Sequence, residues 1–211
     1  MSQESLDFSQ ALARAKNFLA NSKTRTIIGI VGKPGAGKSR LSSFLIENLP
    51  SDEVALLPMD GYHLSNKILA SLGRSDRKGA PDTFDSQGFA ALLARISSER
   101  DSDIYFPIFY REIEESFAAD GVITAKTKLV ITEGNYLLLE EGGWGQVASH
   151  LTESWFVEIN DDLRLERLVD RHHKYGKERQ AAFEWAHGTD ERNAQLVDKT
   201  KAKANFLVQN T

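Results

Sequence analysis

The stretch "TIIGIVGKPGAGKSRLSSFLIENL", residues 26–49, decides the fold. It opens on a short apolar run with β-branched residues, which is typical of a buried strand. Three glycines follow within six residues (Gly32, Gly35 and Gly37), and apolar residues then recur at helical spacing over 39–49. The sequence therefore predicts a strand, a glycine-rich turn and a helix in direct succession.

The glycine-rich turn matches the pattern G-x-x-x-x-G-K-S/T over eight residues: Gly32, Lys33, Pro34, Gly35, Ala36, Gly37, Lys38 and Ser39. Glycines let successive backbone N–H groups face an anion, and the next helix presents its positive end to it. Lys38 can reach the outer phosphates of a nucleotide, and the Ser39 hydroxyl can ligate Mg²⁺. We predict that this loop, with the adjoining Arg40, binds nucleotide phosphates. The alternative is a turn that only caps an ordinary helix.

The rest of the chain alternates strands with helices. A helix is predicted within 1–25, and further strands are predicted over 53–60, 128–134 and 154–160. Further helices are predicted over 63–72, 86–98 and 161–176, with a polar loop over 74–85. This alternation predicts an α/β fold of three layers, with a mostly parallel sheet covered by helices on both faces. We expect residues 1–211 to form a single domain.

The composition limits the class of protein. The chain has 211 residues, 41% of them hydrophobic and 27% charged, and a formal net charge of −4, so it offers no general attraction to nucleic acid or an acidic membrane. It contains no cysteine, which excludes disulfides and zinc–thiolate sites. No apolar run approaches the length that spans a bilayer. We expect a cytoplasmic protein with neither nucleic-acid nor membrane partners.

Two carboxylates end predicted strands. Asp60 closes "EVALLPMD" and Glu133 closes "KLVITEG". In a parallel sheet both would lie at the same edge as the glycine-rich loop, where ligands of such sheets bind. A carboxylate there can accept the proton of an attacking hydroxyl or hold Mg²⁺. The alternative for Asp60 is that it only starts the turn "DGYH".

A basic segment covers about 164–190. Arg164, Arg167 and Arg171 share one helical stripe, and Arg179 follows Gly176. Guanidinium groups suit phosphate oxygens, so this segment is predicted to be a helical lid in which Arg167, Arg171 and Arg179 contact the nucleotide. The alternative is a solvated helix end whose bases complement the helix dipole.

Several motifs together are similar to those of one kinase family. "GKPGAGKS", "MDGYH", "RKGAPDTFD", "ITEGNYLLL" and the arginine-rich segment resemble the phosphoribulokinase, uridine kinase and type I pantothenate kinase family, over about residues 27–197. The resemblance is closest to a bacterial group labelled nucleoside/nucleotide kinase or fructose transport system kinase, whose pattern includes "EWAHGTDERNAQLV". It implies a P-loop fold, ATP with Mg²⁺, and transfer of the γ-phosphate to an alcohol.

The resemblance also implies residue roles. Asp60 would be the base, Lys38 and Arg171 would assist transfer, and Ser39, Glu133 and Asp60 would hold the metal. Residues 193–197 would lie close to adenine. The substrate pocket would be lined by Asp60, Tyr62, His63, Lys78 and Arg111. The chain departs from the family where relatives carry aspartate or histidine after an aromatic residue, because here the sequence is Phe109-Tyr110-Arg111.

The sequence therefore predicts a kinase that uses ATP and Mg²⁺ to phosphorylate a hydroxyl-bearing small molecule. A nucleoside-monophosphate kinase would need more bases in the acceptor pocket than Lys78 and Arg111. A nucleotide-dependent regulatory module without turnover is the other alternative. Asp85-Ser86-Gln87-Gly88 has the D-x-x-G pattern of GTPases, but no N-K-x-D motif follows it. The acceptor stays open among pantothenate, a nucleoside, a sugar and another cofactor precursor, and a homodimer is permitted.

Overall fold

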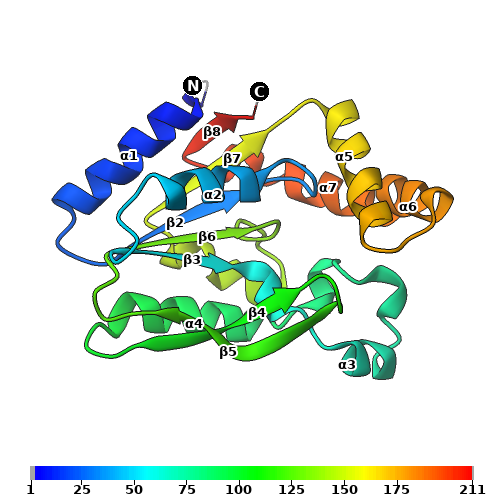
Figure 1. Cartoon of the computed structure of the whole chain (residues 1–211), viewed down its shortest axis with the longest axis horizontal. Helices are drawn as coiled ribbons and strands as arrows, with labels where there is room; N and C mark the ends of the chain where they lie inside the picture. Colours follow the sequence, from blue (N-terminus) through cyan, green and yellow to red (C-terminus); the bar gives the residue numbers. More distant parts are fainter. Residues whose placement is uncertain (1–2, 211) are drawn as a thin grey trace.

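A six-stranded parallel sheet forms the centre of the computed structural model, which describes residues 3–210 (Figure 1). Met1, Ser2 and Thr211, which belong to the predicted domain, lie outside the described residues. In spatial order the strands are β1 (Ser5–Leu6), β8 (Phe206–Gln209), β7 (Glu153–Glu158), β2 (Thr26–Val31), β6 (Leu129–Gly134) and β3 (Val54–Pro58). The predicted α/β fold is confirmed.

Helices cover both faces of this sheet. One face packs against α1 (Phe8–Asn21) and α2 (Lys38–Glu47), and its core includes Ile28, Ile30 and Trp155. The opposite face packs against α4 (Ser86–Ser98), and its core includes Ile27, Val31 and Phe89. Residues 27 and 31 of β2 thus belong to one core and residues 28 and 30 to the other, because successive side chains of a strand point to opposite faces.

A helical group lies at the carboxyl end of the sheet (Figure 1). It contains α5 (Asp161–Lys174), α6 (Arg179–Trp185), a π-helix (Ala186–Asp190) and α7 (Glu191–Asp198), and α3 (Asn66–Ser71) lies on the same side of the molecule. These elements stand around the edge where ligands of parallel sheets bind. No helix within residues 3–210 is long and apolar enough to cross a membrane.

An antiparallel hairpin, which the sequence analysis did not predict, stands apart from the main sheet. It consists of β4 (Ile104–Tyr110) and β5 (Glu115–Ile123), joined by the turn at 111–114. Ile104, Phe106 and Ile123 are buried in the same core cluster as the apolar residues of α4, whereas Tyr105 and Val122 are exposed. The hairpin carries Arg111 to the carboxyl end of the sheet. The backbone of β4 passes close to Gly61 there, because a Cβ on Gly61 would lie 2.0 Å from the Pro107 carbonyl oxygen.

Most predicted elements are found with small changes in their limits. The strand over 26–31 and the helix over 86–98 are confirmed. The strand predicted over 53–60 ends at Pro58, and Asp60 lies in the 3₁₀ turn Met59–Tyr62 that follows it. Within the N-terminal region a short strand, β1, precedes the predicted helix. The helix predicted over 63–72 begins only at Asn66, because Ser65 caps it by accepting from the Ile68 amide.

Candidate active site

The P-loop connects β2 to α2. Two of its glycines have backbone angles that favour glycine, and each has a neighbouring side chain that leaves no room for a Cβ. Gly35 and Gly37 have φ of 80° and 92°, a region that favours glycine. A Cβ on Gly35 would lie 2.8 Å from Leu168 Cγ of α5, and one on Gly37 would lie 2.0 Å from Asn210 Nδ2. No side chain caps α2, so the amides of its first turn have no side-chain partner. The loop is therefore shaped as an anion cradle between α5 and the C-terminal segment.

Lys38 lies at the centre of the cradle. Its Nζ donates to the Gly32 carbonyl at 3.0 Å, the Lys33 carbonyl at 3.2 Å and Asn135 Oδ1 at 2.5 Å. Burial lowers the pKa of Lys38 to about 8, although the charges of Glu133 and Asp60 act to raise it. A buried ammonium held mostly by neutral oxygens is poised to gain an anionic partner.

Ser39 and Glu133 form the second feature of the site. Ser39 Oγ donates to Glu133 Oε1 at 2.7 Å, which brings a hydroxyl of α2 next to a carboxylate of β6. Burial raises the pKa of Glu133, while Lys38 and the Ser39 hydrogen bond act to lower it. Both groups are hard oxygen donors of the kind Mg²⁺ takes. Within residues 3–210 no group of three or more His, Asp or Glu is placed to hold a metal ion by itself.

Asp60 faces the same cleft from the turn after β3. Its Oδ2 accepts from Arg111 Nη2 at 2.6 Å. Burial acts to raise the pKa of Asp60, but the charges of Arg111, His63, Lys38 and Arg171 outweigh it and leave the pKa lowered. The carboxylate is therefore ionised at neutral pH, as a proton acceptor must be.

The predicted acceptor residues divide into two groups. His63 lies between the rings of Phe84 and Phe109, with centroids 4.0 Å and 4.5 Å away, and its Nδ1 lies 2.8 Å from the Asp60 carbonyl. His63, Lys78 and Arg111 line one cleft with Asp60. Tyr62 does not line this cleft, because its ring packs edge-on against Phe89 in the core at 5.2 Å. Burial accordingly raises the pKa of Tyr62 to about 12.

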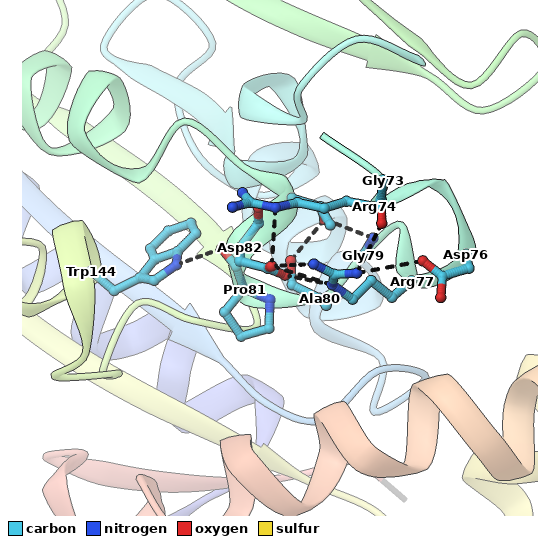
Figure 2. A network of polar contacts seen from close by, with 10 residues as sticks. Gly73, Arg74, Asp76, Arg77, Gly79, Ala80, Pro81, Asp82 and Trp144 are labelled. Atoms are coloured by element: carbon cyan, nitrogen blue, oxygen red, sulfur yellow. Dashed lines mark hydrogen bonds and ion pairs between the residues drawn. The ribbon is translucent and has the colours of Figure 1, made fainter. Parts of the chain in front are cut away.

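The loop at 73–85 is held by its own charged residues (Figure 2). The Asp82 carboxylate accepts from Arg77 Nη2 at 2.9 Å and Arg77 Nε at 3.2 Å, and Arg74 Nε lies 3.4 Å away. Figure 2 also shows Trp144, whose Nε1 donates to the Pro81 carbonyl at 3.1 Å. The motif "RKGAPDTFD" contributes Lys78, Gly79 and Phe84 to the lining of the cleft, and its Asp82 is engaged within the loop.

Asp82→Asn is expected to lower the free energy of unfolding by about 1 kcal/mol, because two partly exposed guanidinium contacts lose their charge partner. Hydrogen bonds from Arg77 lower the pKa of Asp82 in the folded protein. The ionised carboxylate therefore stabilises the fold at pH values above its unfolded-state pKa, near 4, and this stabilisation is lost as the pH falls through the folded-state pKa. The difference between the variant and the wild type should therefore shrink below about pH 4. Urea unfolding at several pH values measures it.

Asp76→Asn is the matched control for Asp82→Asn. The Asp76 side chain is 81% exposed and meets only Arg77 Nη1 at 3.5 Å, whereas Asp82 is 43% exposed and meets two arginines. We expect no change beyond about 0.3 kcal/mol in the control, as for most exposed pairs. Equal effects of the two variants would show that the Asp82 network does not brace the loop.

The arginines predicted to form the lid do not share one environment. Arg171 lines the cleft with Lys38 and Asp60, and among the described residues it has no hydrogen-bond or ion-pair partner within 4 Å. Burial, followed by repulsion from Arg111, lowers the pKa of the Arg171 guanidinium. Arg179 lies instead in a groove between α5 and α6, 3.8 Å from Asp170. Arg167 lines neither space.

Other basic residues near the P-loop hold the protein structure. Arg164 is 1% exposed and does not line the cleft, although helical spacing places it on the same stripe as Arg171. Its guanidinium binds Asp161 at 2.7 Å and also Glu191, and it reaches the Pro34 carbonyl at 3.4 Å, which ties α5, α7 and the P-loop together. Lys33 pairs with Asp161 at 2.6 Å. Arg40 donates to Asn210 Oδ1 at 2.6 Å and does not line the cleft.

The structure adds residues that sequence reasoning missed. Asn135 contacts Lys38, and Asn210 donates to the Ala36 carbonyl at 2.7 Å. His172 Nε2 lies 2.6 Å from Asp190 Oδ2 at the edge of the cleft, beside Trp185. Only Asn135 had a sequence signal, because it directly follows the predicted strand that ends in Glu133 and Gly134. Of the segment predicted near adenine, Asn193 lines the cleft and Val197 lies in the core.

The Asp85-Ser86-Gln87-Gly88 pattern has a structural explanation. Asp85 caps α4, and its Oδ1 accepts from the Gly88 amide at 2.9 Å. An N-cap carboxylate satisfies an amide that the first helical turn leaves unpaired. The pattern therefore places no acidic group in the cleft.

Comparison with known proteins supplies the family. No family model matches the chain. It is 32% identical over 195 residues to Escherichia coli K12 YggC, described as uncharacterized, covering 90% of this chain and 80% of YggC. It is 28% identical over 201 residues to a protein of Schizosaccharomyces pombe named as a candidate uridine kinase, covering 90% and 86%. The structure superimposes on that of a candidate fructose transport system kinase from Silicibacter sp. TM1040 with a TM-score of 0.83 and 30% identity, over 93% of this chain and 97% of the other.

The chain belongs to a family of P-loop kinases whose members include proteins named as a candidate fructose transport system kinase and as uridine kinase-like. The family resemblance drawn from the sequence is therefore confirmed. Membership in this kinase family implies nucleotide use. The comparisons do not identify the phosphate acceptor.

Proposed function

We propose that this P-loop kinase transfers the γ-phosphate of ATP to an alcohol group of a small metabolite. The observation that carries the proposal is one cleft of about 470 Å³ lined by Lys38, Ser39, Glu133, Asp60 and Arg171. Its size is that of small-molecule sites. The cleft combines a phosphate cradle, paired oxygen donors, an ionised carboxylate and an unpaired arginine, which are the parts that phosphoryl transfer requires.

In the proposed reaction the hydroxyl oxygen of the acceptor forms a bond to the γ-phosphorus. The bond from that phosphorus to the β–γ bridging oxygen breaks, and ADP leaves with the electron pair. Asp60 orients the hydroxyl and takes its proton. Lys38 and Arg171 stabilise negative charge on the moving phosphoryl group, and the P-loop amides hold the phosphates.

We assign Mg²⁺ to Ser39 and Glu133, with Asp60 as a further candidate ligand. The support is the 2.7 Å contact between Ser39 Oγ and Glu133 Oε1 beside Lys38. A bound Mg²⁺ would neutralise phosphate charge. Glu133 would keep the Ser39 hydroxyl oriented, since a ligating group held by a neighbour loses less freedom on binding.

An ADP-release screen across hydroxyl-bearing metabolites tests the proposal, with the shift in melting temperature as a second readout. We expect ADP formation to depend on Mg²⁺, ATP and one alcohol together. Transfer to a nucleoside monophosphate would instead identify the phosphate-acceptor alternative. Tight Mg–ATP binding with no turnover on any compound would support a regulatory module, and no binding of Mg–ATP would refute both kinase proposals.

A further inference from the structure

Arg111 is placed at the acceptor end of the cleft by the turn of the β4–β5 hairpin. Its side chain is 38% exposed and its Nη2 donates to Asp60 Oδ2 at 2.6 Å. Among the described residues Asp60 is its one hydrogen-bond partner. A guanidinium has five N–H donors in a planar fork, so most donors of Arg111, which lines the cleft, are not used by the described residues.

One wall of the cleft combines the rings of Phe109 and His63 with two cations, Lys78 and Arg111. The Phe109 ring stacks on His63, with centroids 4.5 Å apart and planes at 28°. Lys78 Nζ lies 5.3 Å from the centroid of the Phe109 ring and the Arg111 guanidinium carbon lies 5.9 Å from it. Phe109, His63, Lys78 and Arg111 all line the cleft that holds Asp60. A ligand against this wall would meet apolar carbon and positive charge together.

The hairpin turn is fixed in place. The Asn66 amide donates to Glu115 Oε1 at 2.9 Å, and Asn66 Nδ2 donates to the Glu114 carbonyl at 3.1 Å. Lys78 donates to the same carbonyl and to Asn66 Oδ1 at 2.7 Å. Glu114 adopts a φ of 55°, which is unusual for a residue other than glycine and is maintained here by these contacts. The turn therefore holds Arg111 next to Asp60 before any ligand binds.

The pairing of Arg111 with Asp60 conflicts with the role of Asp60 as a base. A carboxylate that accepts a hydroxyl proton weakens its ion pair, which leaves Arg111 partly buried without a counter-charge beside the unpaired Arg171. An uncompensated cation in such a place is costly. Lys78 cannot supply the missing negative charge, because it is itself a cation. Glu114, the acid nearest to Lys78, lies 3.7 Å from its Nζ and pairs with it.

We propose that the acceptor carries an anionic oxygen group, a carboxylate or a phosphate, which Arg111 binds in place of Asp60 with Lys78 as the second cation. Binding of this group draws the guanidinium away from Asp60 and frees the carboxylate for the acceptor hydroxyl. Neutral alcohols lack the group, so they leave Arg111 on Asp60. This inference rests on the proposed kinase function and narrows its substrate to anionic alcohols.

The test uses pairs of probes that differ only in the anionic group. D-glycerate is compared with glycerol, and pantothenate with pantothenol, for a carboxylate. D-ribulose 5-phosphate is compared with D-ribulose for a phosphate. Each probe is added to the full chain with Mg²⁺ and a non-hydrolysable ATP analogue, and the melting temperature is measured. With ATP itself, KM and kcat are measured for each probe that accepts phosphate.

We expect an anionic probe to raise the melting temperature and its neutral partner to raise it less. Arg111→Gln should raise KM for the anionic probe about 10- to 100-fold, the loss typical of a charge-assisted contact, and leave KM for ATP within about twofold. Arg95→Gln, which removes an exposed pair with Glu99 on α4, is the control and should change none of these.

Three results would overturn the inference. The neutral member of a pair could bind as tightly as its anionic partner, Arg111→Gln could weaken ATP as much as the acceptor, or no anionic probe could bind. Phosphorylation of a neutral alcohol would remove the anionic requirement and leave the kinase function intact. Failure of the wild type to bind Mg–ATP would refute the kinase function itself, so the two failures are distinguishable.

Discussion

Asp60→Asn is expected to lower kcat by about 10²- to 10⁴-fold, the range typical of a positioned general base. The amide is close in size to the carboxylate but cannot take the hydroxyl proton. Asp60 accepts from Arg111 at 2.6 Å in the turn after β3, whereas the P-loop lies between β2 and α2. The Kd for ATP should therefore stay within about twofold, because the proposed phosphate contacts come from backbone amides and Lys38.

Two measurements separate this loss from a loss of folding. The melting temperature of Asp60→Asn should fall, because Arg111 loses its counter-charge, but the variant should still unfold in one cooperative transition well above the assay temperature. Single-turnover kinetics of the folded variant should show a slow chemical step with normal ATP binding. Asp120→Asn is the matched control, because Asp120 is an exposed acid of β5 whose Oδ2 accepts from Tyr110 at 2.6 Å. A variant at Asp60 that turns over like the control would refute the base assignment.

The sequence predicts the elements that carry local signals. The apolar run of β2 and the glycine spacing after it specify the P-loop, and helical spacing specifies α4, whose N-cap in the structure is Asp85. The parallel arrangement also brings Asp60 and Glu133 to one edge of the sheet, as the strand-end rule predicts. The P-loop and α4 depend on residues close together in the chain, and the meeting of Asp60 and Glu133 follows from the parallel pairing of β3 with β6.

The β4–β5 hairpin escaped prediction because its signals conflict. Pro107 interrupts the alternation of β4, and Asp120-Gly121, a usual turn signal, lies inside β5 instead of at the turn. The turn itself carries "REIE", which has no glycine, proline or asparagine. Its geometry is maintained by contacts with Asn66 and Lys78, which are more than thirty residues away in sequence.

Arg164 shows the limit of reasoning from helical spacing. The spacing places Arg164 and Arg171 on one stripe of α5, but it does not say what packs against each turn. Arg164 is buried because Glu191 of α7 and the Pro34 carbonyl meet it, whereas Arg171, two turns later, lines the cleft. One stripe thus contains a structural cation and a candidate catalytic one, and only tertiary contacts distinguish them.

Lys38→Met is the second change with a large expected effect, a fall in kcat/KM for ATP of about 10²- to 10³-fold, as for loss of one preorganised donor to developing charge. Methionine keeps the unbranched shape of the side chain and removes the ammonium that contacts Gly32, Lys33 and Asn135. Lys128→Met is the matched control, since Lys128 is exposed and pairs with Glu53 at 2.5 Å.

Calorimetry gives Lys38 a signature that a structural role would not produce. Burial lowers the pKa of Lys38 to about 8, so part of the population lacks the proton above that pH. Anionic phosphates favour the charged form and raise the pKa, so binding of Mg–ATP at pH 8.5 should take up a fraction of a proton, and binding at pH 6.5 should take up almost none. Titrations in buffers of different ionisation enthalpy measure this uptake. The difference between the two pH values should vanish in Lys38→Met and persist in Lys128→Met, and its persistence in Lys38→Met would show that another group meets the phosphates.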